Sequence, residues 1–170
     1  MLSEILHTYT LNLRHLRRLV ADLDDAEMVT QTGSAPNHAA WIIGHLIHSC
    51  EAMCGEIGVD PWLTEDWRGL FGTGSTPLGN ADSYPSKGSL LTALDDAYSR
   101  LSDALSELGE SGMLAPLPDM QYRKSLPTIG HALVHILASH TALHVGQLTV
   151  WRKAIGLPRV PEQFDHDSNA

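Results

Sequence analysis

The chain has 170 residues, about the size of one domain, and its 43% hydrophobic and 18% charged content is that of an ordinary globular protein. Its formal net charge is -9, from 11 Lys and Arg against 20 Asp and Glu. Such an acidic chain repels phosphate backbones and offers no polybasic patch to an anionic membrane, so we expect neither a nucleic-acid partner nor membrane association. The N-terminus lacks the basic-then-apolar order of a signal peptide, and no apolar run approaches the ~20 residues that span a bilayer, which predicts a cytoplasmic protein.

The first predicted helix starts at the N-terminus. Its apolar residues recur at alternating gaps of four and three and therefore share one face. They are Leu2, Leu6, Tyr9, Leu13, Leu16, Val20 and Leu23. A face of this kind is typical of a helix in a bundle.

The second predicted helix runs from about Asn37, an N-cap after Pro36, to Gly58. It is apolar nearly all round. One face holds Trp41, Ile42, Leu46 and Met53, and another holds Ile43, Ile47, Cys50 and Cys54. A helix with two apolar faces must be covered on both sides, so we expect a homodimer in which a second subunit covers the second stripe. The two cysteines, one turn apart, are expected to be buried, reduced thiols.

A long connection follows, over residues 58–89. It is too rich in Gly, Pro and Ser to predict a regular element, and its length permits a crossover between helices that are not antiparallel neighbours. Its aromatic residues Trp62, Trp67 and Phe71 should anchor it to the helices, although they could also line a pocket.

Two further helices are predicted beyond the connection. In the third, leucines and a tyrosine recur at gaps of three and four up to a stop at Gly109; they are Leu91, Leu94, Tyr98, Leu101, Leu105 and Leu108. The fourth starts near Thr128 and ends at Gly156. The fold class is therefore all-α, a four-helix bundle with a long connection between helices 2 and 3. Residues 1–158 form the single domain and residues 159–170 a polar tail.

The fourth helix carries two histidine pairs at one-turn spacing, His131 with His135 and His140 with His144. At ~100° per residue the pairs project on opposite sides, so only one can face the interior. The apolar residues cluster around the direction of His140 and His144, which predicts that this pair faces inward with Gln147 beside it. Two such imidazoles converge on one point, as the histidines of metal-binding H-E-x-x-H helices do.

A third ligand would come from the second helix, where His38, His45 and His48 are candidates. His45 is favoured because it projects among the core residues, whereas His48 lies toward the edge. Three neutral imidazoles would leave open positions on zinc, nickel or iron, as a catalytic site requires. The competing interpretation is that these are core histidines with hydrogen-bonded neighbours. The glutamate of the zinc proteases is absent, because Thr141, Ala142 and Leu143 separate the pair.

Four motifs in the sequence, "WIIGHL", "FGTG", "HILASHTALHVGQL" and "WRKAIGLP", resemble the DinB/YfiT-like family of metalloenzymes. The resemblance extends from the first helix to Pro158. It implies a four-helix bundle, often a homodimer, in which His45, His140 and His144 hold one divalent metal and Gln147 supports the site. Many relatives differ at Thr141, Ala142 and Leu143, where they carry a bulky polar or aromatic residue.

Characterised members of that family include transferases and isomerases that use thiols such as bacillithiol or mycothiol. The resemblance and the three-histidine pattern together suggest an enzyme in which the metal activates a thiol or water, of the S-transferase or hydrolase type, acting on a small-molecule substrate. No general base is evident; His48 and Glu51 are candidates by position only. The alternative is a non-catalytic dimeric bundle that binds a metal or ligand in stress response. A site closed by a fourth protein ligand would favour that alternative, and a pocket that reaches the metal would favour an enzyme.

Overall fold

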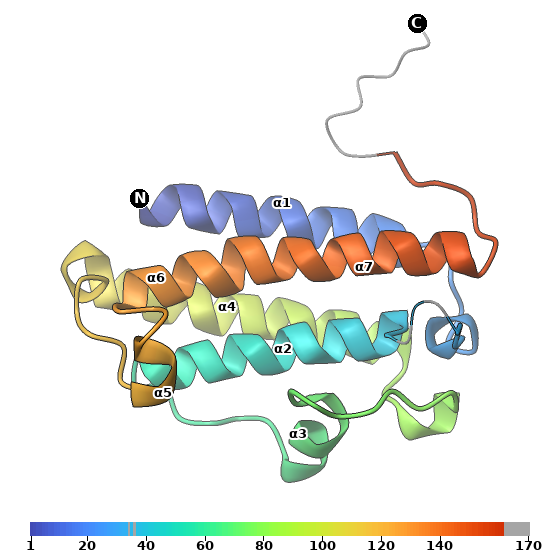
Figure 1. The fold of residues 1–170 in the computed structure, drawn as a ribbon, viewed down its shortest axis with the longest axis horizontal. Coiled ribbons are helices and arrows are strands. Elements are labelled where there is room, and N and C mark those ends of the chain that lie inside the picture. The colour runs from blue at the N-terminus through green and yellow to red at the C-terminus, as the bar shows by residue number, and fades with distance from the viewer. Residues whose placement is uncertain (34, 36, 162–170) are drawn as a thin grey trace, which may run out of the picture.

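The computed structural model describes residues 1–33, 35 and 37–161, and within them the fold is all-helical. Four long helical stretches run alongside one another (Figure 1): α1 (Leu2–Val20), α2 (Ala39–Glu56), α4 (Lys87–Gly112) and a continuous stretch of α6 (Ile129–Leu133), η3 (Val134–His140) and α7 (Thr141–Ala154). Shorter elements join them: η1 (Glu27–Val29), α3 (Glu65–Phe71), η2 (Ala81–Ser83) and α5 (Met120–Arg123). No described helix is long and apolar enough to cross a bilayer.

The long connection works as a crossover, as predicted. α2 packs against α4 and both run in the same direction, while α1 and the last stretch run the opposite way (Figure 1). The prediction that the connection holds no regular element is wrong for α3. Its N-cap Thr64 accepts a hydrogen bond from the Trp67 backbone N–H. Glu65 and Asp66 lie in its first turn, where their negative charges interact favourably with the positive end of the helix dipole.

The second apolar stripe of α2 is buried inside the chain itself. Ile43, Ile47, Cys50 and Cys54 are each at most 1% exposed, and the Cys50 thiol donates to the Ala97 carbonyl of α4 at 3.3 Å. Both cysteines are free and buried, as predicted. Because α4 and the rest of the core cover this stripe, it does not call for a second subunit, and the argument for a homodimer from this stripe no longer holds.

Several predicted helix ends differ in detail. α2 has His38, not Asn37, as its N-cap, and the predicted Pro36 lies outside the described residues. α4 continues to Gly112, but Gly109 breaks its helical geometry with φ 65°, so the predicted stop marks a kink. The last stretch starts after Thr128, as predicted, and ends at Ala154, just before Gly156. Of the predicted tail 159–170, residues 162–170 lie outside the described part.

The last helical stretch is tied to α1 by a buried arginine. Arg152 is 2% exposed and donates to both carboxylate oxygens of Asp22, at 2.7 and 3.0 Å. It also donates to the carbonyls of Leu19 and Pro158. The arginine of "WRKAIGLP" therefore fixes the ends of two long helices to the chain that follows, and its role is structural.

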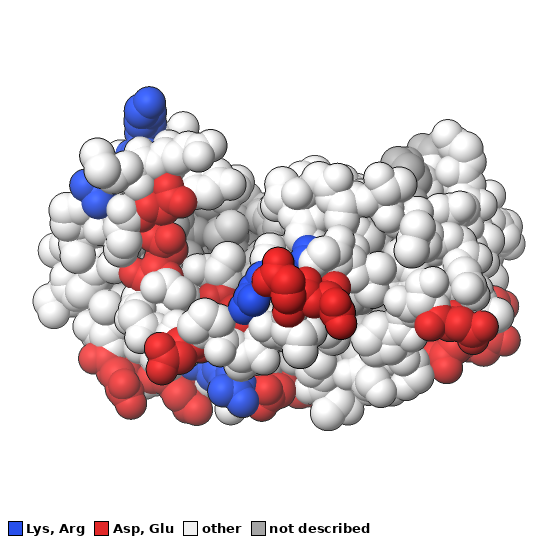
Figure 2. All heavy atoms as spheres, turned by 90° about the horizontal axis from the view of Figure 1, so that it is seen from below, with Lys and Arg blue, Asp and Glu red and all other residues white. Residues whose placement is uncertain are grey.

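The surface is acidic and notched. Seen from below, Asp and Glu outnumber Lys and Arg on this face, and the outline is hollowed between the end that carries α5 and the region of α3 (Figure 2). The site described next lies between these two regions.

Candidate metal centre

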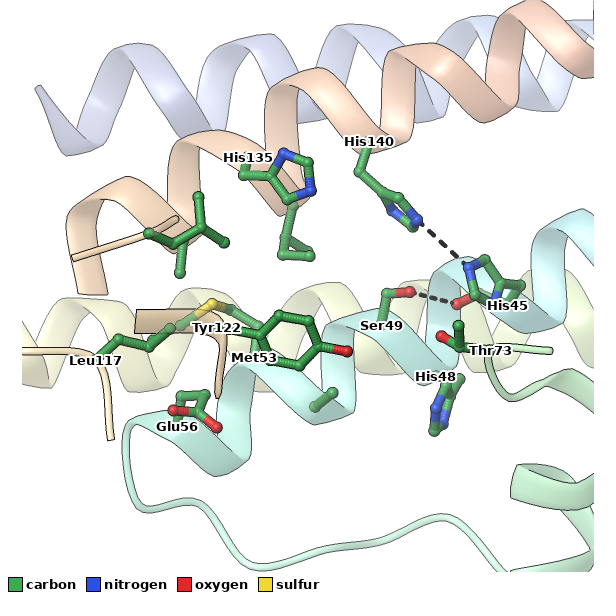
Figure 3. Close-up of a pocket in the computed structure, with 14 residues that line it drawn as sticks. His45, His48, Ser49, Met53, Glu56, Thr73, Leu117, Tyr122, His135 and His140 are labelled. Atoms are coloured by element: carbon green, nitrogen blue, oxygen red, sulfur yellow. Dashed lines mark hydrogen bonds between the residues drawn. The ribbon is translucent and has the colours of Figure 1, made fainter. Parts of the chain in front are cut away.

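Three histidines from separate elements meet in the interior. His45 comes from α2, His140 is the last residue of η3, and His144 lies in the first turn of α7. The Nε2 atom of His140 lies 3.3 Å from that of His45 and 3.1 Å from that of His144. Their ligand atoms all fall within 4.8 Å of one another, and Figure 3 shows His140 and His45 pointing toward each other. The structure thus brings together the three histidines that the sequence analysis selected.

The outer nitrogens of two of these rings are held by oxygen acceptors. His45 Nδ1 lies 2.8 Å from the Phe71 carbonyl oxygen, and His144 Nδ1 lies 3.0 Å from Gln147 Oε1. Asn37 donates to the same Gln147 oxygen at 3.3 Å, which orients the amide. Because these oxygens can only accept, each Nδ1 carries the proton and each Nε2 directs a lone pair at the common point.

A divalent metal fits this arrangement. Lone pairs on Nε2 atoms 3.1 to 3.3 Å apart repel one another unless a proton or a cation lies between them. With metal–nitrogen bonds of ~2.0–2.1 Å, two ligands of a tetrahedral site lie about 3.3 Å apart. His140 is held differently, because its Nδ1 is buried and has no hydrogen-bond partner among the described residues.

The electrostatics keep the rings neutral. Burial, followed by the charge of the neighbouring imidazoles, lowers the pKa of His140 and of His144 from 6.5 to about 4. Burial also lowers the pKa of His45. Metal ligation requires neutral imidazole, so all three side chains are in the competent form near pH 7 without paying for deprotonation.

The long connection forms the outer wall of the centre. Trp41 stacks on His45 with ring centroids 4.7 Å apart and an 8° angle between the planes, and its indole N–H donates to Ser75 Oγ at 2.8 Å. Phe71 is fully buried against Gly44, where a Cβ atom would lie only 2.1 Å from Phe71 Cδ1. Only a glycine at position 44 lets Phe71 sit close enough for its carbonyl to reach His45.

The connection's aromatics act mainly as anchors, the role the sequence analysis favoured. Trp67 donates its indole N–H to the Gly44 carbonyl at 3.3 Å, and Arg100 lies over the Trp62 ring at 5.1 Å. Neither tryptophan nor Phe71 lines the cavity next to the centre.

A cavity of about 240 Å³ opens from the histidines and runs along α2. Figure 3 shows His45 and His140 at one end and Leu117 and Glu56 at the other. Its walls come from α2, the segment after α3, α5 with the chain on either side of it, and the last helical stretch. The lining residues are His45, His48, Ser49, Ala52, Met53, Glu56, Thr73, Leu117, Tyr122, Leu126, Ala132, His135, Ile136 and His140. A ligand can therefore reach the centre from outside.

His135 also lines this cavity, and its ring centroid is 6.2 Å from that of His140. The prediction that His135 projects away from His140 is therefore wrong, whereas His131 is exposed and bonded to Thr128, outside the cavity. The reason is that Val134–His140 is a π-helix, in which a turn closes between residues five apart, so two histidines five apart come onto the same side.

Two side chains satisfy carbonyls in this π-helical turn. The Thr141 hydroxyl donates to the Ile136 carbonyl, five residues earlier, at 2.9 Å, and the side-chain amide of Asn12 in α1 donates to the Ala138 carbonyl at 3.4 Å. Thr141 is itself buried. These contacts support a geometry that would otherwise leave carbonyls without an α-helical partner.

The other candidates from the sequence analysis, His38, His48 and Glu51, have three different positions relative to the cavity. His38 caps α2: its Nδ1 accepts from the Trp41 backbone N–H at 3.2 Å, and its Nε2 donates to the Leu78 carbonyl at 3.0 Å. His48 lines the cavity near His45, and burial lowers its pKa. Glu51 lies outside the cavity. It accepts from the backbone N–H groups at positions 62 and 63 and pairs with Arg68, so it anchors the connection and is not in position to act as a base in the cavity.

Sequence reasoning missed Glu56, Tyr122 and Thr73 as cavity residues. Glu56 could have been found, because it follows His45 by three helical turns and so shares its side of α2. Tyr122 and Thr73 lie outside the predicted helices, on α5 and just after α3, where periodicity carries no information. Only the tertiary structure brings them to the wall.

Comparison with known proteins gives one result. Neither a curated protein nor a solved structure matches the chain. A family model described as the DinB superfamily matches residues 8–148, a span that holds His45, His140, His144 and Gln147. This span covers most of the chain, and the chain therefore belongs to the DinB superfamily.

Proposed function

We propose that this protein is a metal-dependent enzyme in which His45, His140 and His144 hold one divalent transition metal that activates a thiol or water, as in an S-transferase or hydrolase. The observation that carries the proposal is the convergence of three Nε2 atoms, two separations of which are 3.1 and 3.3 Å, at the end of a cavity. The DinB superfamily is a metal-binding family, which supports the same conclusion.

The cavity favours an enzyme over a metal-binding protein without turnover. Among the described residues, no fourth His, Cys, Asp or Glu joins the group of three. His45 and His140 border the cavity directly, so coordination positions that the protein leaves free would face it. A closed structural zinc site uses four protein ligands, whereas catalytic sites keep a position for water or substrate.

Each residue has a separable part in the mechanism. When bound, the metal supplies Lewis acidity that makes a thiol or a water nucleophilic near neutral pH. The Phe71 carbonyl and Gln147 fix the orientation of His45 and His144. The cavity walls orient the substrate against this end and reduce the access of water. His48 and His135 line the cavity next to His45 and His140, with ring centroids 6.4 and 6.2 Å away, and are the candidates for proton exchange with a substrate bound there.

The remaining parts of the proposal concern the setting of the site. We propose a four-helix bundle as the frame, formed by α1, α2, α4 and the last helical stretch. We also propose that the protein acts in the cytoplasm, where its free cysteines stay reduced, on a small molecule such as a low-molecular-weight thiol. A homodimer remains a proposal from family resemblance; light scattering at micromolar concentration tests it, and a monomer would reject it.

Elemental analysis of protein purified without a metal-affinity tag tests the metal site. The parent is compared with a His140→Ala, His144→Ala double variant and with a matched His7→Ala, His131→Ala variant, in which both histidines are exposed. We expect close to one zinc, nickel or iron per chain in the parent and the control, and almost none in the site variant. A parent that holds no metal after reconstitution with any of the three would reject the proposal.

Assays for thiol transfer and for hydrolysis with the loaded parent then separate the two reaction types. A loaded site that supports neither reaction would favour the non-catalytic bundle.

A further inference from the structure

The cavity has two chemically different ends. The end at the histidines is polar, with Ser49 and Thr73 beside them. Beyond it the wall is mostly apolar, formed by Ala52, Met53, Leu117, Leu126, Ala132 and Ile136 together with His135 and Tyr122. A substrate that fills the cavity must therefore carry an apolar body behind its reactive group, because burying a polar body against this wall would leave its hydrogen bonds unmade.

The far end is acidic. Glu56 lies there (Figure 3), and its Oε2 accepts the Asp119 backbone N–H at 2.9 Å. The Tyr122 ring extends from α5 toward the middle of the cavity, and its hydroxyl points toward the histidine end (Figure 3). The negative face of an aromatic ring, together with a carboxylate, favours a cation. A ligand carboxylate placed at this end would be repelled at short range by the negative charge of Glu56.

The basic side chains of the described cavity wall are histidines: His45, His48 and His140 lie at the end opposite Glu56, and His135 lies across the cavity on the last helical stretch (Figure 3). Among the described residues that line the cavity there is no Lys or Arg. Arg123 is close in sequence to Tyr122, but its guanidinium donates to the Leu117 carbonyl and to the Pro118 carbonyl, the latter at 3.2 Å. The net charge of -9 adds a long-range field of the same sign.

The dimensions limit the size of the ligand. At 1.5 Å per residue along α2, Glu56 lies about 16 Å beyond His45. The volume of about 240 Å³ lies just below the ~300–1,000 Å³ usual for ligand pockets. A narrow, elongated molecule fits these limits better than a branched, sugar-sized one.

We propose that the substrate is a small elongated molecule with an apolar body and a far end that carries no negative charge, bound with its reactive group at the histidines and its far end beside Glu56. This inference rests on the proposed function for the identity of the reactive end. A carboxylate-bearing thiol is a poor fit, because the described cavity wall offers its far end no Lys or Arg.

Calorimetric titration of the zinc-loaded protein tests the inference with two matched sets of ligands. The first set is three alkanethiols of one chain length whose far ends carry a hydroxyl, an ammonium or a carboxylate. The second set has the same bodies and far ends with a methyl group in place of the thiol. The variants are Glu56→Gln, which keeps an acceptor for the Asp119 N–H, and Glu107→Gln, which removes the same charge from an exposed position on α4.

In the parent and in Glu107→Gln we expect the hydroxyl and ammonium ligands of both sets to bind about tenfold more tightly than the carboxylate ligands. In Glu56→Gln the difference should shrink to about twofold. Equal or tighter binding of the carboxylate ligands in the parent would overturn the inference. So would a preference that survives in Glu56→Gln, or the absence of binding by every ligand.

The two sets also separate this inference from the proposed function. If a thiol and its methyl counterpart bind equally while the dependence on the far-end charge remains, thiol activation at the metal is rejected and the selectivity of the cavity stands. If thiols bind more tightly than their counterparts but without any dependence on charge, the metal site stands and the inference fails.

Discussion

The two ends of the cavity are built in different ways. At the histidine end, His45 and His144 are each 5% exposed, and each ring is held through its outer nitrogen by an oxygen acceptor. At the other end, Tyr122 is 57% exposed on the four-residue helix α5. Buried and hydrogen-bonded groups hold one geometry, whereas exposed groups on short elements can move and change at little cost. Under the proposed function, the chemistry takes place at the rigid end and substrate selection at the adaptable one.

Acid should disrupt the histidine end most strongly in the metal-free protein. The folded-state pKa values of His140 and His144 lie at about 4, below the unfolded value of 6.5, so between these limits the unfolded chain binds more protons than the folded one. The contribution of these two histidines to the free energy of unfolding is therefore fully present above pH 6.5, decreases as the pH drops toward 4, and levels off below pH 4. After a discount for partial solvent exposure, the loss is on the order of 3 kcal/mol.

Urea unfolding of the metal-free protein from pH 7.5 to 4 measures this loss. The His140→Ala, His144→Ala variant provides the control and should give a flatter profile. A parent whose stability does not change across this window would show that the rings are not held neutral by the fold.

Gly44→Ala should break the wall behind the histidine end. The added methyl group would overlap the Phe71 ring, pushing Phe71 and its carbonyl away from His45. We expect the free energy of unfolding to fall by about 3 kcal/mol, as for an overpacked core. Gly55→Ala is the matched control on the same helix, because nothing lies within 4 Å of its Cβ position, and it should gain about 0.5–1 kcal/mol. Denaturant unfolding compares the two; similar stabilities would refute the close packing of Phe71.

Gln147→Ala should loosen the histidine end without removing a ligand. His144 would lose the acceptor for its Nδ1–H, and its ring would no longer be held in one orientation. We expect zinc affinity to fall about 10–100-fold with little change in the fold. Competition with a chromophoric chelator measures it, with Gln121→Ala on exposed α5 as control. Unchanged affinity would mean that packing alone orients His144.

Tyr122→Ala should have the smallest effect and sharpen the contrast between the ends. Because the side chain is mostly exposed, stability should stay within about 0.5 kcal/mol of the parent, and metal content should not change. Binding of an alkyl ammonium ligand should weaken about threefold through loss of the aromatic face. Calorimetry and elemental analysis report the two properties separately. Loss of metal in this variant would contradict the independence of the two ends.

Local sequence patterns were enough to find the rigid end. The apolar periodicity of the fourth predicted helix selected His140 and His144, and the same reasoning on the second favoured His45. Direction on a helix follows from spacing alone as long as the helix is regular. Burial of these residues then follows from the apolar residues that share their side, because such a face must be covered.

The same reasoning failed where the helix is not regular or where the covering element is distant in the sequence. His135 was placed on the wrong side because the π-helical turn changes the spacing that brings residues into line, and its support from Asn12 comes from another helix. The second stripe of α2 suggested a partner subunit because a sequence cannot tell which element covers a face. Here α4 covers it, brought alongside in the same direction by the long connection.

The amino-acid sequence by itself therefore determined the four long helices, the inward histidines and the family, since these depend on residue types at fixed local spacings. The tertiary structure decided that the Phe71 carbonyl holds His45, that Glu51 secures the connection while Glu56 faces the cavity, and that His135 lines the cavity wall. These features depend on which distant segments come together, and that depends on how the whole chain packs rather than on any local pattern.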